Sequence, residues 1–182
     1  MALITYLTRI QFDHGALALL AGELAALGLR RPLVVTDRGL VASGLVERLH
    51  AALPARGAAA VYDGTPENPT ERAVWQALER YQAAACDGVI GFGGGSSMDL
   101  GKAVALLATH APPLTQYMMA EGGVPRITAA VAPVVAIPTT AGTGSEVGRG
   151  AVIVLDDGRK LALISPHLIP RLAICDPSLT LG

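Results

Sequence analysis

The sequence predicts an α/β fold in which a parallel sheet is flanked by helices and a β-hairpin is added near the C-terminus. Apolar runs alternate with helical patterns along the chain, which is the order that right-handed β-α-β crossovers produce. Two of these runs, residues 88–92 and 134–137, are apolar without interruption, as strands buried on both faces of a parallel sheet are. Two further runs, 152–155 and 160–164, flank a turn that ends on Gly158 and predict the hairpin.

The elements follow one another in a regular order. Residues 5–12 have a strand pattern, and the helical pattern over 16–27 ends at Gly28, because glycine readily takes the conformation that ends a helix. The helix expected over 70–84 begins with Thr70 as its N-cap. The other strands are expected at residues 32–36, 58–62, 88–92, 134–137 and 172–175, and the other helices at 45–53 and 100–109.

The composition excludes several classes of partner. Fourteen basic and 15 acidic residues give a net charge of −1, which argues against nucleic acid or an anionic membrane as a partner. No apolar run approaches the roughly 18 residues of a membrane span. The N-terminus lacks the basic start of a signal peptide. Charged residues make up only 16%, so the chain either buries a large core or exposes apolar surface.

Cysteines and histidines give weaker information. Cys86 and Cys175 lie far apart at the edges of apolar segments, and we expect buried free thiols in the reducing cytoplasm, with a disulfide as the alternative. The histidines have no metal-ligand spacing, so we expect them on the surface or in packing contacts. No catalytic residue and no metal ligand is assigned. The four histidines are His14, His50, His110 and His167.

A run of three glycines, residues 93–95, joins an apolar strand to a helical pattern. Glycine lets the backbone approach a ligand closely, and the free N–H groups of a following helix suit a phosphate. A tight turn without a ligand is the alternative. A Walker A loop is excluded because Ala103 follows Lys102 and Ser96 replaces the first glycine, and Ser96 also breaks the G-x-G-x-x-G fingerprint. The turn therefore predicts a pyrophosphate cradle of another lineage.

Polar residues follow three of the predicted strands, where ligands bind in a doubly wound sheet. They are Asp37, the glycine turn, and Thr139 with Thr140. An acid at a strand end suits a ribose diol and repels a 2′-phosphate, so Asp37 predicts NAD rather than NADP; a helix N-cap is its alternative role. Hydroxyl residues and glycines in the segment 138–146 could surround an adenine or a nicotinamide amide, although an ordinary polar loop has the same composition.

These motifs together resemble the N-terminal domain of the iron-containing (group III) alcohol dehydrogenase family. The resemblance runs from about Thr8 to Gly182, and one NAD-binding domain is expected over residues 1–182. The motifs that carry it are Val35-Thr36-Asp37, Asn68-Pro69-Thr70, Asp87-Gly88 through Gly93-Gly94-Gly95-Ser96 with Asp99 and Lys102, Pro138-Thr139-Thr140 through Gly144-Ser145-Glu146, and Asp176-Pro177 with Leu179.

The resemblance implies a Rossmann-like domain with a specific NAD site. It implies that Asp37 contacts the adenosine ribose, that Asn68 lies near the cofactor and that Lys160 reaches a ribose or phosphate oxygen. In addition, Gly94, Gly95 and Ser96 would hold the pyrophosphate, Thr139 and Thr140 would approach the adenine, Leu179 and Gly182 would line the domain junction, and Asp99 and Thr143 complete the expected cofactor-binding set.

One position departs from the family pattern. Gly148 stands where the family usually has a threonine, so any cofactor contact from that hydroxyl is absent. The longer strings at residues 146–150 and 157–160 are similar to a branch associated with 4-hydroxybutyrate and related short-chain alcohols.

The resemblance also implies an activity. The expected reaction is hydride transfer between NAD(H) and a short-chain primary alcohol or aldehyde, such as 4-hydroxybutyrate and succinate semialdehyde. Family members continue into an all-helical domain that carries the metal ligands, so iron or zinc is expected only with that domain. This chain alone is expected to be inactive and to self-associate, as a homodimer, through its uncovered interface. The alternatives are a dehydroquinate-synthase-like lyase domain and a non-catalytic nucleotide-binding module.

Overall fold

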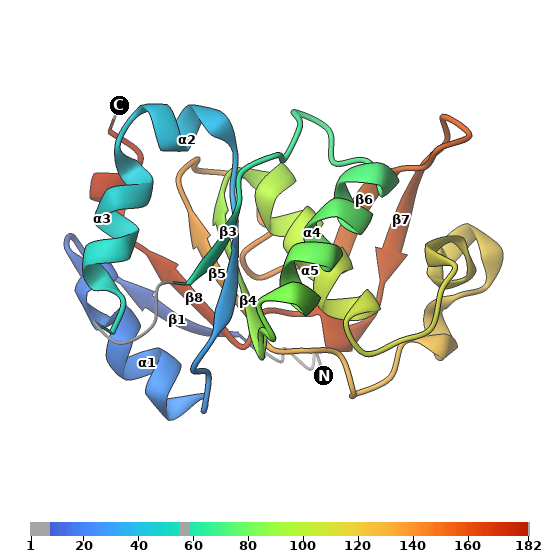
Figure 1. The fold of residues 1–182 in the computed structure, drawn as a ribbon, viewed down its shortest axis with the longest axis horizontal. Helices are drawn as coiled ribbons and strands as arrows, with labels where there is room; N and C mark the ends of the chain where they lie inside the picture. The colour runs from blue at the N-terminus through green and yellow to red at the C-terminus, as the bar shows by residue number, and fades with distance from the viewer. Residues whose placement is uncertain (1–7, 55–58, 182) are drawn as a thin grey trace, which may run out of the picture.

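A computed structural model describes residues 8–54 and 59–181 (Figure 1). Within these residues, six parallel strands form one sheet in the order β1-β8-β5-β4-β2-β3. The predicted parallel sheet is thereby confirmed, while the starts of the strands expected at residues 5 and 58 fall outside the described residues. The bounds are β1 Arg9–Phe12, β2 Pro32–Val35, β3 Ala60–Tyr62, β4 Gly88–Gly93, β5 Val134–Pro138 and β8 Leu172–Cys175.

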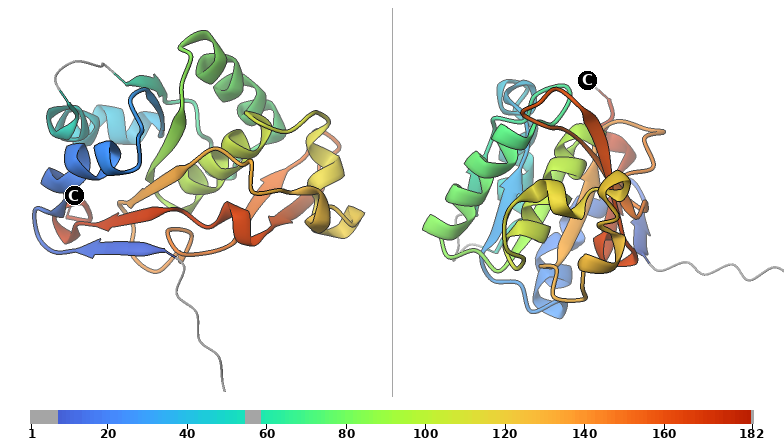
Figure 2. Two further views of the ribbon diagram at one scale, coloured as in Figure 1. Left: turned by 90° about the horizontal axis from the view of Figure 1, so that it is seen from below. Right: turned by 90° about the vertical axis from the view of Figure 1, so that its right-hand side faces the viewer.

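Helices cover both faces of the sheet (Figures 1 and 2). The helices α1, Leu20–Ala26, and α3, Leu45–Ala52, lie on one face; α4, Glu71–Ala83, and α5, Gly95–Leu107, lie on the other. The core is accordingly split into two clusters. Alternate residues of β2 supply opposite clusters, since successive side chains of a strand point to opposite faces.

The added hairpin is also confirmed. Strands β6, Gly150–Val154, and β7, Lys160–Ile164, pair antiparallel and form a separate two-stranded sheet. The hairpin packs against α5, and the Val154 N–H donates to the Pro69 carbonyl at 2.9 Å, just before α4. The hairpin is therefore fixed to the helical layer rather than to the main sheet.

Three local expectations were inaccurate. A short helix that the pattern did not predict, α2, Arg38–Ala42, follows β2 directly. The first helical segment begins as a 3-10 turn, Ala16–Leu19, before α1. Helix α5 begins at Gly95, immediately after the glycine turn, because glycine and serine are acceptable in a first helical turn although they weaken a helix interior.

Membrane-spanning potential and the state of the cysteines are described for the same residues, 8–54 and 59–181. Among them, no helix combines the length and the hydrophobicity that crossing a membrane requires. Both cysteines are half-buried free thiols, and burial raises the pKa of Cys86 and of Cys175.

Candidate nucleotide-binding site

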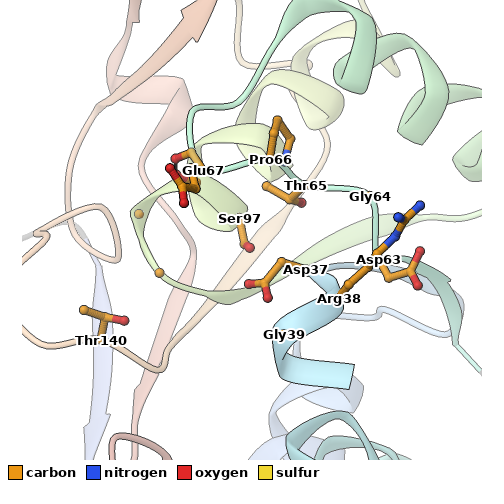
Figure 3. Close-up of a pocket in the computed structure, with 13 residues that line it drawn as sticks. Asp37, Arg38, Gly39, Asp63, Gly64, Thr65, Pro66, Glu67, Ser97 and Thr140 are labelled. Atoms are coloured by element: carbon orange, nitrogen blue, oxygen red, sulfur yellow. Dashed lines mark hydrogen bonds between the residues drawn. The ribbon is translucent and has the colours of Figure 1, made fainter. Parts of the chain in front are cut away.

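A cavity of about 660 Å³ lies beyond the carboxyl ends of β2, β3 and β4 (Figure 3). From β2 the chain moves outward to β3, then crosses back to β4 and continues to β5 on the other side. The cavity therefore lies at the point where the strand order reverses, which is where open α/β sheets bind ligands. Its lining residues are Asp37, Arg38, Gly39, Asp63, Gly64, Thr65, Pro66, Glu67, Gly94, Gly95, Ser96, Ser97 and Thr140.

The N-terminus of α5 opens onto this cavity without a side-chain cap. Its cap residue, Gly94, is extended and has no side chain to accept from the first helical turn. By contrast, α2 and α4 are capped by the side chains of Asp37 and Thr70. A Cβ built at Gly94 would meet nothing closer than the Thr140 Oγ1, at 3.6 Å. The open space beside free N–H donors fits a phosphate group.

Two glycines before α5 allow this close arrangement. Gly93 has a φ of +145°, and a Cβ there would lie 2.7 Å from the Ser97 Oγ. At Gly91 a Cβ would lie 3.0 Å from the Met98 Cα, so the helix could not pack as closely on the strand. These glycines let the chain turn sharply from β4 into α5.

Asp37 has both of the roles considered for it. Its Oδ1 accepts the Leu40 N–H at 3.0 Å and caps α2, as the alternative interpretation expected. The same carboxylate lines the cavity, and within the described residues its Oδ2 makes no hydrogen bond. One oxygen is thus committed to the helix and the other remains for a ligand.

Asn68 and Lys160 are brought together at the edge of this region. The Lys160 Nζ, at the start of β7, donates to the Asn68 Oδ1 at 2.8 Å. Neither residue lines the cavity, although Glu67 does. The Ser96 Oγ donates to the Glu67 carbonyl, which ties the glycine turn to the segment that carries Asn68.

The remaining expected residues occupy different environments. Asp99 does not line the cavity; its carboxylate accepts from the Ser145 Oγ and the Val152 N–H, at 2.6 and 2.9 Å. Leu179 is only 2% exposed and packs in the core. The Thr139 N–H donates to a backbone carbonyl of β4 at 3.0 Å, Thr143 lies beside Gly95, and Gly182 falls outside the described residues.

A second cavity, of about 330 Å³, lies at the carboxyl ends of β1, β5 and β8. It shares Thr140 with the larger cavity, so one residue stands between the two. Several of its walls are apolar. The lining residues are Phe12, Pro138, Thr140, Ala141, Gly142, Glu146, Cys175, Asp176, Pro177 and Thr180.

The sequence reasoning missed the segment after β3. Asp63 and Thr65 line the larger cavity, and Figure 3 shows them across from Thr140. The Thr65 hydroxyl is buried without a hydrogen-bond partner. The signal was present, because an acid and a glycine directly follow a predicted strand, as they do at the other ligand-facing strand ends.

No metal centre is formed by the part of the chain that the structure describes. Histidine, cysteine, aspartate and glutamate side chains nowhere gather there in groups of three or more that could hold an ion. The residues present therefore do not fit a catalytic iron or zinc.

Comparison with known proteins agrees with this architecture. Residues 8–177 match the family model for iron-containing alcohol dehydrogenase. The chain belongs to this family. The match confirms the family that the motifs indicated.

Individual known proteins are similar to this chain over nearly its whole length. The 4-hydroxybutyrate dehydrogenase of Cupriavidus necator is 55% identical over 182 residues, covering 100% of this chain and 47% of that protein. The lactaldehyde reductase of Escherichia coli K12 is 36% identical, and the match covers 94% of this chain and 45% of that protein. The structure of the sulfoacetaldehyde reductase of Bifidobacterium kashiwanohense in complex with NAD+ superposes with a TM-score of 0.89 at 31% identity. The superposition covers 97% of this chain and 46% of that protein. The chain thus spans about half the length of these relatives.

Proposed function

We propose that this chain is the NAD-binding part of a dehydrogenase that transfers hydride between NAD(H) and a short-chain primary alcohol or aldehyde. The observation that carries the proposal is the uncapped N-terminus of α5, which faces a cavity lined on another side by Asp37. The NAD+ complex of a related structure and the 4-hydroxybutyrate dehydrogenase relative support it. Because of the 4-hydroxybutyrate dehydrogenase relative, we propose 4-hydroxybutyrate and succinate semialdehyde as the substrate pair.

The two cavities suit neighbouring parts of an adenine dinucleotide, the pyrophosphate with its ribose in the larger cavity and the adenine in the smaller one. The N–H groups at Gly95 and the residues after it would hold the pyrophosphate, and the Asp37 Oδ2 would accept from a ribose hydroxyl. The smaller cavity, with Pro138 and Pro177 among its walls, offers apolar side chains against which an adenine ring would pack. Thr140 borders both cavities and would lie between these parts of the cofactor.

NAD, when bound, supplies the hydride acceptor at its nicotinamide ring. The residues of this chain would bind and orient the cofactor, and none is assigned a proton-transfer role. Since the described residues do not fit a metal ion, no step is assigned to one. We place the ligands for iron or zinc, and the substrate-binding wall, in the part of the relatives' length that this chain does not match.

The proposal includes a homodimer in the cytoplasm. Ile10 and Phe12 are 41% and 74% exposed on the edge strand β1, and exposed apolar side chains favour self-association. The free thiols of Cys86 and Cys175 suit a reducing compartment. Light scattering coupled to size-exclusion chromatography tests the dimer.

Replacing Gly94 by alanine tests the cofactor site. The Gly94 backbone conformation is open to any residue, and the new Cβ would make only ordinary contact with Thr140, at 3.6 Å, while occupying the cavity beside the first turn of α5. We therefore expect unchanged stability and a loss of NAD affinity of at least about tenfold, measured by calorimetric titration. Gly22→Ala is the matched control, because a Cβ at Gly22 in α1 meets nothing within 4 Å. Unaltered NAD binding by Gly94→Ala would reject the proposed phosphate position.

A further inference from the structure

Lys102 is a fully buried lysine in α5 with all of its hydrogen-bond donors used. Its Nζ donates to the Ser145 Oγ at 3.0 Å, the Gly148 carbonyl at 2.9 Å and the Gly150 carbonyl at 2.8 Å. An ammonium group has three N–H donors, so this set satisfies it completely. Burial lowers the pKa of Lys102 to about 8, and the nearby acid Asp99 opposes that shift.

Asp99 lies one turn earlier on the same face of α5. Its Oδ1 accepts from the Ser145 Oγ at 2.6 Å and lies 3.9 Å from the Lys102 Nζ. Its Oδ2 accepts the Val152 N–H at 2.9 Å. Together the two side chains hold the end of the loop that follows β5 and the start of β6.

The loop that this pair holds lies on the glycine turn. A Cβ at Gly94 would be 3.6 Å from the Thr140 Oγ1, and one at Gly95 would be 3.4 Å from the Thr143 Cβ. Within the described residues, every hydrogen bond that joins residues 140–148 to another part of the chain is made by Lys102 or Asp99. The position of the loop therefore depends on α5.

We infer that Lys102 and Asp99 are positioning residues for the proposed NAD site. One helix then sets two parts of that site: its N-terminus presents the N–H groups, and its next turn fixes the loop that carries Thr140 and Thr143. Neither Lys102 nor Asp99 lines a cavity, so they act on the cofactor only through the loop. This inference rests on the proposed function, since it assumes that NAD binds between the loop and the glycine turn.

The variant Lys102→Met tests the inference with two measurements. Methionine keeps most of the side-chain length and removes all three donors. We expect NAD affinity to fall at least about tenfold in calorimetric titration, and amide hydrogen exchange to accelerate across residues 140–148. Asp99→Asn keeps an acceptor for the Val152 N–H and should have a smaller effect on both measurements.

Leu49→Ala controls for a general loss of stability. Leu49 is fully buried on the opposite face of the sheet from α5, in the other core cluster. This variant should destabilise the protein without changing the NAD affinity or the exchange of residues 140–148. A parallel loss of affinity in Leu49→Ala would overturn the inference, because the effect of Lys102 would then be structural only.

Two further outcomes are decisive. A folded Lys102→Met variant with wild-type affinity and wild-type loop exchange would overturn the positioning role. If Lys102→Met does not fold, Ser145→Ala takes its place, since it removes the hydroxyl that links both residues to the loop. A wild-type chain that binds no NAD would instead reject the proposed function, and loop exchange alone would then show whether Lys102 fixes the loop.

Discussion

Replacing Asp37 by asparagine removes one charge from the larger cavity and leaves its shape unchanged. The Oδ1 of Asp37 accepts the Leu40 N–H at 3.0 Å, and an asparagine oxygen caps a helix about as well. We therefore expect the free energy of unfolding to change by less than about 1 kcal/mol. The variant isolates the effect of the charge on the choice between NAD and NADP.

The magnitude follows from the charges that line the cavity. A 2′-phosphate would bring close to two negative charges towards the carboxylate. Two unit charges about 4 Å apart interact by about 4 kcal/mol at an effective dielectric constant near 20. Arg38 lines the same cavity and offsets part of this repulsion. If Arg38 and the solvent offset more than half of this repulsion of about 8 kcal/mol, a net penalty of about 3 kcal/mol remains, so NAD should bind at least about 100-fold more tightly than NADP.

Calorimetric titration with both cofactors measures this ratio. In Asp37→Asn the preference for NAD should fall to within about tenfold, mainly through tighter binding of NADP. Glu79→Gln is the control, because it removes one negative charge at an exposed position of α4. Equal affinities in the wild type, or an unchanged ratio in Asp37→Asn, would refute the assignment of the charge as the selective element.

Three further predictions concern stability and the loop. Gly93→Ala should lower the free energy of unfolding by at least about 2 kcal/mol in urea, since φ is +145° and the Cβ would lie 2.7 Å from the Ser97 Oγ. Because the pKa of Lys102 falls from 10.5 to about 8 on folding, the unfolded chain holds more protons between these pH values. The free energy of unfolding should then rise by up to about 3 kcal/mol from pH 8 to pH 10.5, relative to Lys102→Met, and a flat difference would contradict this. Gly148→Thr should displace the loop, because a Cβ would approach the Gly144 carbonyl oxygen to 2.9 Å; faster hydrogen exchange in the loop checks it.

The sequence predicted the strands of the main sheet well because their signal is local. A strand buried on both faces is apolar throughout, as β4 and β5 are, and neighbouring segments do not alter that pattern. Helix α2 was missed because five residues are too few to show a helical period. The sequence pattern also predicted no structure for the segment between α5 and β5. There His110 accepts the Thr128 N–H at 3.0 Å, and a contact between residues so far apart produces no periodic pattern in the sequence.

The parts of the candidate site that could be predicted are those that a single residue type marks at the end of a strand. The glycine turn and Asp37 follow strands and need no partner to be noticed. The arrangement around Asp99 was not predictable, because the Ser145 hydroxyl that it accepts from lies 46 residues further along the chain. Which polar residue faces the cavity and which faces a loop depends on tertiary packing rather than on local sequence.

The place of β1 in the sheet has a consequence for how the chain folds during synthesis. Among the residues that the structure describes, β1 is an edge strand that pairs with β8, and Arg9 is aligned with Leu172. Residues 9–12 therefore leave the ribosome about 160 residues before the strand with which their backbone groups pair. Closing so long a loop is slow, so β1 stays unpaired with β8 at least until residues 172–175 have been made. Chaperone binding and aggregation during expression are expected to depend on this segment.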